Sequence, residues 1–208
     1  MIAVLDYGIG NLRSAEKALA HVGAEVALVS DPEEAERAEA VVLPGVGAFG
    51  ACAEALVASG LDRTCRLAFE RGLPFLGICV GFQLLFEGSE EDPGALGLGL
   101  VPGQVRRVRG EVKLPQMQWN RLERTASPSV MLEGLGEAPW FYFVHSFAPE
   151  VIPENEKLVV GTCDYGEGVV GAIEAGPLWG VQFHPEKSGH SGLELLGGFV
   201  AAVARARG

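Results

Sequence analysis

The first hundred residues alternate short apolar runs with helical repeats, and this alternation restricts the possible folds more than any other feature. Apolar runs typical of buried strands occupy 2–5, 25–29, 40–43 and 75–78. Helical patterns lie between them, at 12–22, 31–34, 48–59 and 61–71. Strands that alternate with helices in this way pair in parallel and are covered on both faces. We therefore expect an α/β fold whose central, mostly parallel sheet is flanked by helices.

The second half of the chain has a different pattern. Short strand-like runs punctuated by Gly and Pro occupy 98–109, 140–144, 158–164, 168–174 and 178–183. Turn residues at 166–168 and 175–177 indicate additional antiparallel strands, and an amphipathic helix over 193–203 closes the chain. No linker, repeat or low-complexity segment divides the 208 residues. We expect a single domain over 1–208.

Composition excludes several classes of protein. Sixteen basic and 27 acidic residues give a net charge of −11, which disfavours binding to nucleic acid or an anionic membrane. No apolar run approaches the roughly 18 residues of a membrane span, and the N-terminus has no basic lead-in typical of a secretory signal. The four cysteines form no C-x-x-C pair, so we expect free thiols, no metal and no redox motif. These features favour a cytoplasmic protein.

One segment departs from the acidic average. Residues 101–124 contain six cations and two acids. Such a segment is either a solvated charged hairpin or a basic patch that faces an acidic partner or a phosphorylated substrate.

The strongest chemical signal is a cysteine between two glycines. Cys79 lies in the segment Gly77–Gly81, directly after an apolar strand and before a helical stretch. This is the G-x-nucleophile-x-G elbow, in which a sharp turn presents the nucleophile and leaves room only for small neighbours. A helix N-terminus at this point also favours the thiolate. The alternative is a buried, inert cysteine, an interpretation that suits Cys52, Cys65 and Cys163.

A cysteine nucleophile needs a base, and the base needs an orienting group. His184 and Glu186 are two residues apart at the end of an apolar strand, where extended backbone directs both to the same face. His184 is therefore the predicted base and Glu186 its orienting carboxylate. His145 is the reserve candidate for the base, and His21 is interpreted as a surface residue.

The reaction also needs donors for an oxyanion. The N–H of Val80, next to the nucleophile, is one candidate. The loop Pro44–Gly47 follows a neighbouring strand, so its Val46 and Gly47 are candidates for a second donor, because glycines permit unusual peptide orientations. The alternative is an ordinary turn at the end of a strand.

Together these residues resemble the class I, or triad, glutamine amidotransferases. The elbow and the His184-Pro185-Glu186 segment are specific to that family. Within the family, the chain resembles the branch of glutaminase subunits of imidazole glycerol phosphate synthase. The supporting segments are 6–14, 44–49, 77–86, 119–120, 142–146 and 184–188. Two positions depart from the branch. Gln116-Met117-Gln118 stands where His-Met-Gly is expected, and Phe147 stands where tyrosine is commoner.

The resemblance implies a glutaminase whose Cys79 attacks the side-chain amide of L-glutamine. His184 acts as general acid and then as base, and Glu186 orients it. Gln83 and Glu91 are implied to hold the amino-acid end of the substrate, with backbone contacts from Ser146 and Phe147. The acidic residues 90–92 are alternatively an exposed turn.

The resemblance also implies a heterodimer and no cofactor. The partner is a (β/α)8-barrel cyclase subunit that receives ammonia through a protected tunnel. Candidate interface residues are Trp119, Asn120, Tyr142 and Lys187, although Trp119 and Tyr142 are equally compatible with an apolar core. Three alternatives stay open: a glutaminase that serves another synthase, a cysteine hydrolase of esters or thioesters, and a binding subunit without activity.

Overall fold

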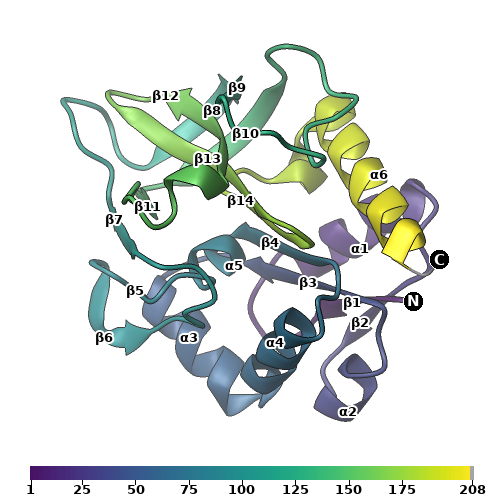
Figure 1. Cartoon of the computed structure of the whole chain (residues 1–208). Helices are drawn as coiled ribbons and strands as arrows, with labels where there is room; N and C mark the ends of the chain where they lie inside the picture. The colour runs from purple at the N-terminus through teal and green to yellow at the C-terminus, as the bar shows by residue number, and fades with distance from the viewer. Residues whose placement is uncertain (207–208) are drawn as a thin grey trace.

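An eight-stranded sheet runs through the computed structural model, which describes residues 1–206 (Figure 1). Its order is β2-β1-β3-β4-β14-β13-β12-β9. The strands are β1 (Ile2–Leu5), β2 (Val26–Val29), β3 (Ala40–Gly45), β4 (Phe75–Cys79), β9 (Glu123–Arg124), β12 (Val159–Asp164), β13 (Gly168–Ala175) and β14 (Leu178–Val181). The strands from β2 to β14 pair in parallel, and the strands beyond β14 pair antiparallel. The predicted fold class is confirmed.

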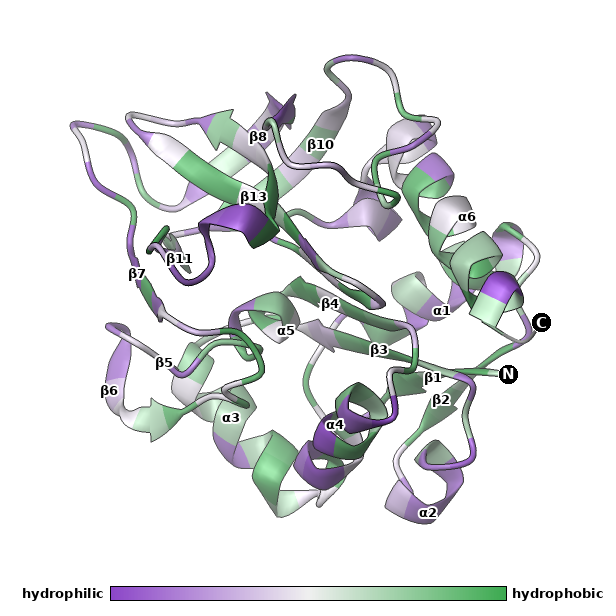
Figure 2. Ribbon diagram, in the orientation of Figure 1, coloured by the Kyte–Doolittle hydropathy of each residue, from purple (hydrophilic) through white to green (hydrophobic). Residues whose placement is uncertain are grey.

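Helices cover the parallel part of the sheet on both faces. They are α1 (Leu12–His21), α2 (Pro32–Ala35), α3 (Phe49–Ala58), α4 (Leu61–Glu70), α5 (Val80–Gln83) and α6 (Gly189–Ala206). Helices α1 and α6 contact each other, and so do α3 and α4 on the opposite side (Figure 1). The green, apolar strands β1, β3 and β4 lie between these two layers (Figure 2). Within residues 1–206, no helix is both long and apolar enough to cross a membrane.

Two smaller sheets flank the large one. A four-stranded sheet has the order β11-β7-β5-β6, and β8 pairs with β10 in an antiparallel ribbon. Their strands are β5 (Gly88–Ser89), β6 (Asp92–Leu96), β7 (Gln104–Arg107), β8 (Gln116–Arg121), β10 (Trp140–His145) and β11 (Phe147–Pro149). Short 3-10 turns, η1 (Glu156–Leu158) and η2 (Pro185–Lys187), complete the structure. The strand expected over 98–109 is wrong in extent, because Pro102 and Gly103, whose φ is +110°, interrupt it.

The parallel pairing gathers three segments at one edge of the sheet. Gly45 at the end of β3 is in register with Cys79 at the end of β4. On the other side of β4, Val181 of β14 is in register with Ile78. The carboxyl ends of neighbouring parallel strands form the usual ligand-binding edge of such a sheet. The loop after β3, the cysteine after β4 and the histidine after β14 therefore meet there.

Candidate active site

Cys79 occupies a strained turn between β4 and α5. Its φ of +55° makes it the one residue besides glycine with positive φ in the described part of the chain. A Cβ at position 81 would lie 1.9 Å from the carbonyl oxygen of Leu43, and one at position 77 would lie 2.9 Å from the Cα of Phe82. Only glycine fits at either place. The backbone thus stores strain at Cys79, as a nucleophile elbow does.

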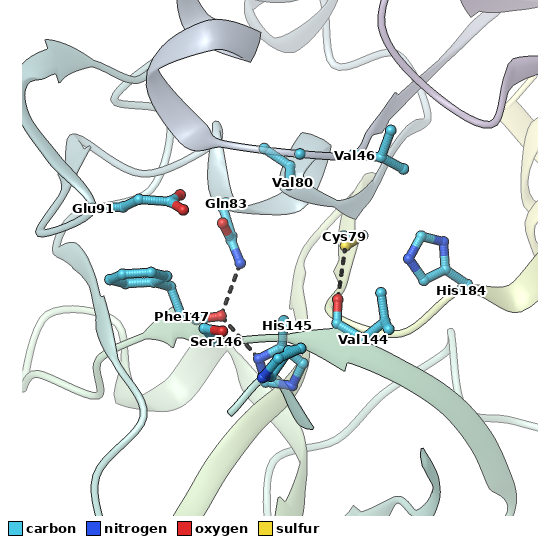
Figure 3. Close-up of a pocket in the computed structure, with 12 residues that line it drawn as sticks. Val46, Cys79, Val80, Gln83, Glu91, Val144, His145, Ser146, Phe147 and His184 are labelled. Atoms are coloured by element: carbon cyan, nitrogen blue, oxygen red, sulfur yellow. Dashed lines mark hydrogen bonds between the residues drawn. The ribbon is translucent and has the colours of Figure 1, made fainter. Parts of the chain in front are cut away.

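The Cys79 side chain borders a cavity of about 200 Å³ (Figure 3). The cavity is lined by Val46, Gly47, Cys79, Val80, Gln83, Glu91, Pro115, Val144, His145, Ser146, Phe147 and His184. It therefore collects the predicted nucleophile, base, oxyanion loop and substrate-binding residues in one place. The Cys79 sulfur donates a hydrogen bond to the carbonyl oxygen of Val144 at 3.8 Å.

His184 and Glu186 form a buried pair next to the sulfur. Nδ1 of His184 lies 2.8 Å from Oε1 of Glu186, and both side chains are 2% exposed. Because a carboxylate can only accept, Nδ1 carries a proton and Nε2 is left for the sulfur side. Nε2 makes no hydrogen bond to any described residue. The backbone between the two residues is a 3-10 turn rather than the expected extended segment, because Pro185 begins η2.

Two neighbours of His184, Cys79 and Glu186, decide its charge. Burial opposes a charged imidazole, but the Cys79 sulfur and the Glu186 carboxylate outweigh burial and raise the pKa of His184 to about 9. The ring is therefore protonated at neutral pH. An imidazolium beside a cysteine sulfur can donate a proton to a leaving group, which is the task of a general acid.

The other three cysteines are free, buried and outside the cavity. Burial raises the pKa of the Cys52 and Cys65 thiols, and it raises that of Cys163 to about 11. A thiol with a raised pKa is a poor nucleophile at neutral pH. These three residues suit the structural role that the sequence suggested for them.

Two side chains hold carbonyl groups of the loop Pro44–Gly47, which carries the predicted oxyanion donors. The Tyr7 hydroxyl donates to the Pro44 carbonyl at 2.6 Å, and the Cys52 thiol donates to the Val46 carbonyl at 3.2 Å. A Cβ at Gly45 would lie 2.5 Å from the backbone nitrogen of Gly81, so the loop packs tightly on the elbow. Val46, Gly47 and Val80 accordingly line the cavity together.

The predicted substrate-binding residues lie on the side of the cavity away from His184 (Figure 3). Gln83 donates from Nε2 to the Phe147 carbonyl at 2.9 Å. Glu91 accepts a hydrogen bond from the Phe49 backbone N–H at 2.9 Å, which fixes its carboxylate beside the cavity. The neighbouring Glu90 and Asp92 are not among the lining residues. Ser146 and Phe147 come from the segment that joins β10 to β11.

His145, the reserve base, lines the same cavity but has different chemistry. Its Nδ1 lies 2.9 Å from the Phe147 carbonyl oxygen, which accepts the ring proton. Burial and the nearby His184 together lower the pKa of His145 to about 4, although the hydrogen bond to the Phe147 carbonyl opposes them. The ring is therefore neutral at physiological pH and lacks an anion that could retain a second proton.

Two residues that contact the catalytic candidates, Asn11 and Gln182, were not predicted from the sequence. Asn11 directly precedes α1, yet its side chain does not cap that helix and instead donates to Oε1 of Glu186 at 3.2 Å. Gln182, fully buried, donates to the Cys79 sulfur at 3.9 Å. No periodic pattern connects residues 175 positions apart. The one sequence feature that could have indicated Gln182 is its position two residues before His184.

Three of the four candidate interface residues lie on the β8–β10 ribbon, and the fourth, Lys187, lies in η2. Trp119 is 47% exposed and makes an edge contact with the partly exposed Tyr142, with ring centroids 6.2 Å apart. Asn120 alternates to the other face, where its amide donates to the Asp164 carbonyl. Lys187 is exposed at the end of η2. Within the basic segment, Arg106 forms a bidentate ion pair with Glu167, so at least this cation is used inside the molecule.

Comparisons with known proteins agree with this geometry. The model of the class-I glutamine amidotransferase family matches residues 3–202. Imidazole glycerol phosphate synthase subunit HisH of Moorella thermoacetica is 45% identical over 99% of this chain and 96% of its own length. The subunit of the same name from Methanothermobacter thermautotrophicus is 47% identical over 98% and 99%. PurLQS from Thermotoga maritima has a similar fold, with a TM-score of 0.72 at 22% identity over 97% of this chain and 95% of that one. The chain therefore belongs to the class I glutamine amidotransferase family, in its HisH branch.

Proposed function

We propose that this chain hydrolyses L-glutamine through a thioester on Cys79 and delivers the ammonia to the cyclase subunit of imidazole glycerol phosphate synthase, in histidine biosynthesis. The observation that carries the proposal is the buried His184–Glu186 pair beside the cysteine of a strained elbow, in a single cavity. The HisH relatives, which match nearly the full chain, support this synthase over others that use glutamine.

In the first half of the reaction, the sulfur of Cys79 attacks the side-chain carbonyl carbon of glutamine. The carbonyl oxygen becomes an oxyanion, for which N–H groups of Val46 or Gly47 and of Val80 are the proposed donors. The C–N bond then breaks, and the His184 imidazolium gives its Nε2 proton to the departing nitrogen. The products of this half are ammonia and a glutamyl thioester on Cys79.

In the second half, neutral His184 takes a proton from a water molecule, which attacks the thioester carbonyl. The C–S bond breaks, glutamate is released, and the sulfur and imidazolium return to their starting state. Glu186 takes no proton in either half. It holds Nδ1–H and stabilises the imidazolium, as the carboxylate of a catalytic triad does.

Recognition of glutamine is assigned to the opposite side of the cavity. The carboxylate of Glu91 is suited to the α-ammonium group of the substrate, and the Gln83 amide is suited to a polar group beside it. Backbone groups of Ser146 and Phe147 are the proposed remaining contacts. No metal or cofactor is needed for this chemistry.

An exposed strip on the β8–β10 ribbon, apolar except for Arg121, is the proposed docking surface for a (β/α)8-barrel cyclase. Cross-strand pairs place Met117, Trp119 and Arg121 opposite Val144, Tyr142 and Trp140 on one face. Met117 and Trp140 are 62% and 52% exposed. The strip starts at Val144, whose carbonyl touches the Cys79 sulfur. Ammonia released at Cys79 is thus produced next to the surface where an acceptor can dock.

The test uses the chain assembled with the cyclase from the same organism. Cys79→Ala should abolish synthesis driven by glutamine and preserve synthesis driven by added ammonia, because the acceptor site is in the partner. A glutamine-mimicking chloroketone should label Cys79 and none of Cys52, Cys65 or Cys163. Glutamine-driven synthesis that persists in Cys79→Ala, or stimulation only by a synthase outside histidine biosynthesis, would reject the proposal. We also expect the complex to be cytoplasmic, without a nucleic-acid or membrane partner.

A further inference from the structure

The Cys79 sulfur contacts one polar side chain that the reaction above does not use, the amide of Gln182. This residue follows β14 directly, lies two positions before His184 and is fully buried. Its Nε2 is 3.9 Å from Cys79 Sγ, and its Oε1 accepts a hydrogen bond from Gln83 Nε2 at 3.0 Å. Resting on the proposed function, we propose that Gln182 is a further catalytic residue, which stabilises the charged sulfur and links it to the substrate-binding side of the cavity.

The two hydrogen-bond neighbours of the sulfur favour opposite charge states. The Val144 carbonyl, 3.8 Å away, accepts the S–H of a neutral thiol, but its partial negative charge repels a thiolate. The Gln182 N–H is a donor, so its bond strengthens when the sulfur becomes an anion. The sulfur is charged before it attacks glutamine and again when water expels it from the thioester. Gln182 therefore acts at both steps, while His184 moves the proton.

The other end of Gln182 reaches the substrate side. Gln83 uses its Nε2 twice, once toward Gln182 and once toward the Phe147 carbonyl at 2.9 Å. A continuous series of buried amides thus connects Cys79 with the segment that is proposed to hold the amino-acid end of glutamine. Loss of the Gln182 oxygen should release Gln83, whereas loss of its N–H alone should affect only the sulfur.

Two variants separate these roles in the assembled enzyme. Gln182→Glu keeps an oxygen for Gln83 but replaces the donor to the sulfur with a carboxylate that repels a thiolate. We therefore expect kcat for glutamine hydrolysis to fall at least about tenfold, with KM within about twofold of the wild type. Gln182→Met removes both groups, so kcat should fall similarly and KM should rise about fivefold. Ammonia-driven synthesis should be unchanged in both.

The chain offers a matched control. Gln116 is also fully buried, and its Nε2 lies 3.8 Å from the sulfur of a cysteine, Cys163, which lies outside the cavity. Gln116→Met should leave kcat and KM within about twofold of the wild type. A kcat for Gln182→Glu that matches this control overturns the inference, while the proposed function survives as long as Cys79→Ala is inactive with glutamine.

If a variant does not fold, a measurement on the wild-type chain tests whether Gln182 donates a hydrogen bond to the ionised Cys79 sulfur. In a chain labelled with ¹⁵N, the side-chain amide proton signal of Gln182 should move downfield as Cys79 ionises, because an anionic acceptor strengthens the hydrogen bond. The Gln116 signal should not follow that ionisation. A Gln182 signal that stays still while Cys79 ionises overturns the inference.

Discussion

The cavity has two walls, each with a buried histidine, and the two rings are in opposite charge states. His184 is 1% exposed and His145 is 6% exposed, and in each ring Nδ1 donates to an oxygen at 2.8 or 2.9 Å. The His184 oxygen belongs to a carboxylate and the His145 oxygen to a neutral carbonyl. The pKa of His184 is raised to about 9, whereas that of His145 is lowered to about 4. Burial removes the second proton from a histidine unless an anion is close enough to hold it.

This contrast supports the proposal that His184, rather than His145, is both the acid and the base of the reaction. Titratable groups whose pKa values are pushed apart by their surroundings identify the catalytic roles in many active sites. In the proposed reaction, His184 is the histidine of the pair that holds a second proton at neutral pH for departing ammonia. The His145 wall instead holds the Phe147 backbone in place, which is a positioning role.

The largest expected effect tests this division directly. His184→Ala should lower glutamine hydrolysis by the assembled enzyme about 10³-fold, because general acid and base catalysis are lost together. His145→Gln should lower it less than about tenfold, because an amide can still donate to the Phe147 carbonyl. Glutamate release measures both, with ammonia-driven synthesis as the control for assembly. If His145→Gln lowered glutamate release more than His184→Ala does, His145 rather than His184 would be the acid and base.

The next effect concerns the anion on the His184 wall. Glu186→Gln should lower kcat about 10²-fold. Without the carboxylate, the pKa of His184 should fall from about 9 toward its ordinary value, so the protonated acid is lost at lower pH. The alkaline limb of the pH–rate profile, measured from pH 6 to 10, should therefore move to lower pH. An unchanged limb would mean that Glu186 does not control the charge of His184.

The two walls also differ in how well the sequence predicts them. The features that predict the surroundings of Cys79 are local in the sequence. An apolar strand followed by a cysteine between two glycines predicts a strained elbow, and Cys79 has the positive φ of such a turn. The register of parallel strands then brings His184 to the same edge, which a β/α pattern implies. The fold of the first half was predictable for the same reason, because strands and helices alternate there without interruption.

The His145 wall is formed by β10 and depends on contacts between residues far apart in the chain, which no local sequence pattern indicates. The strand over Gln116–Arg121 was not predicted, because its buried face begins with a glutamine rather than an apolar residue. Its place is fixed only by pairing with β10. The hydrogen bonds that hold His145, Gln83 and Gln182 likewise join residues far apart in the chain. Such side-chain networks have no periodicity that could be recognised in advance.

Because His184 and His145 have opposite charge states, their contributions to the free energy of unfolding should depend on pH in opposite directions. His145 has a folded pKa of about 4, below its ordinary value, so its contribution is present above pH 6.5 and is lost as pH falls toward 4. His184 has a folded pKa of about 9, so its contribution is present below pH 6.5 and is lost as pH rises through 9. Each full contribution is on the order of 3 kcal/mol.

Urea unfolding of the wild type and of His145→Gln at pH 7 and pH 4.5 measures the first of these terms. The wild type should lose about 2 kcal/mol more unfolding free energy between the two pH values than the variant does, because glutamine does not titrate. Equal losses in both proteins would show that His145 is not held neutral by burial.

The smallest expected effect concerns Asn11, which supports the His184 wall from α1. Asn11→Ala removes one hydrogen bond to Glu186 and should lower kcat about fivefold, which corresponds to about 1 kcal/mol. Asn11→Asp separates this role from helix capping, because aspartate caps a helix as well as asparagine does. A second carboxylate beside Glu186 repels it, so Asn11→Asp should be slower than Asn11→Ala. Steady-state glutaminase rates rank the variants, and an Asp variant as active as the wild type would show that the Asn11 side chain does not act on Glu186.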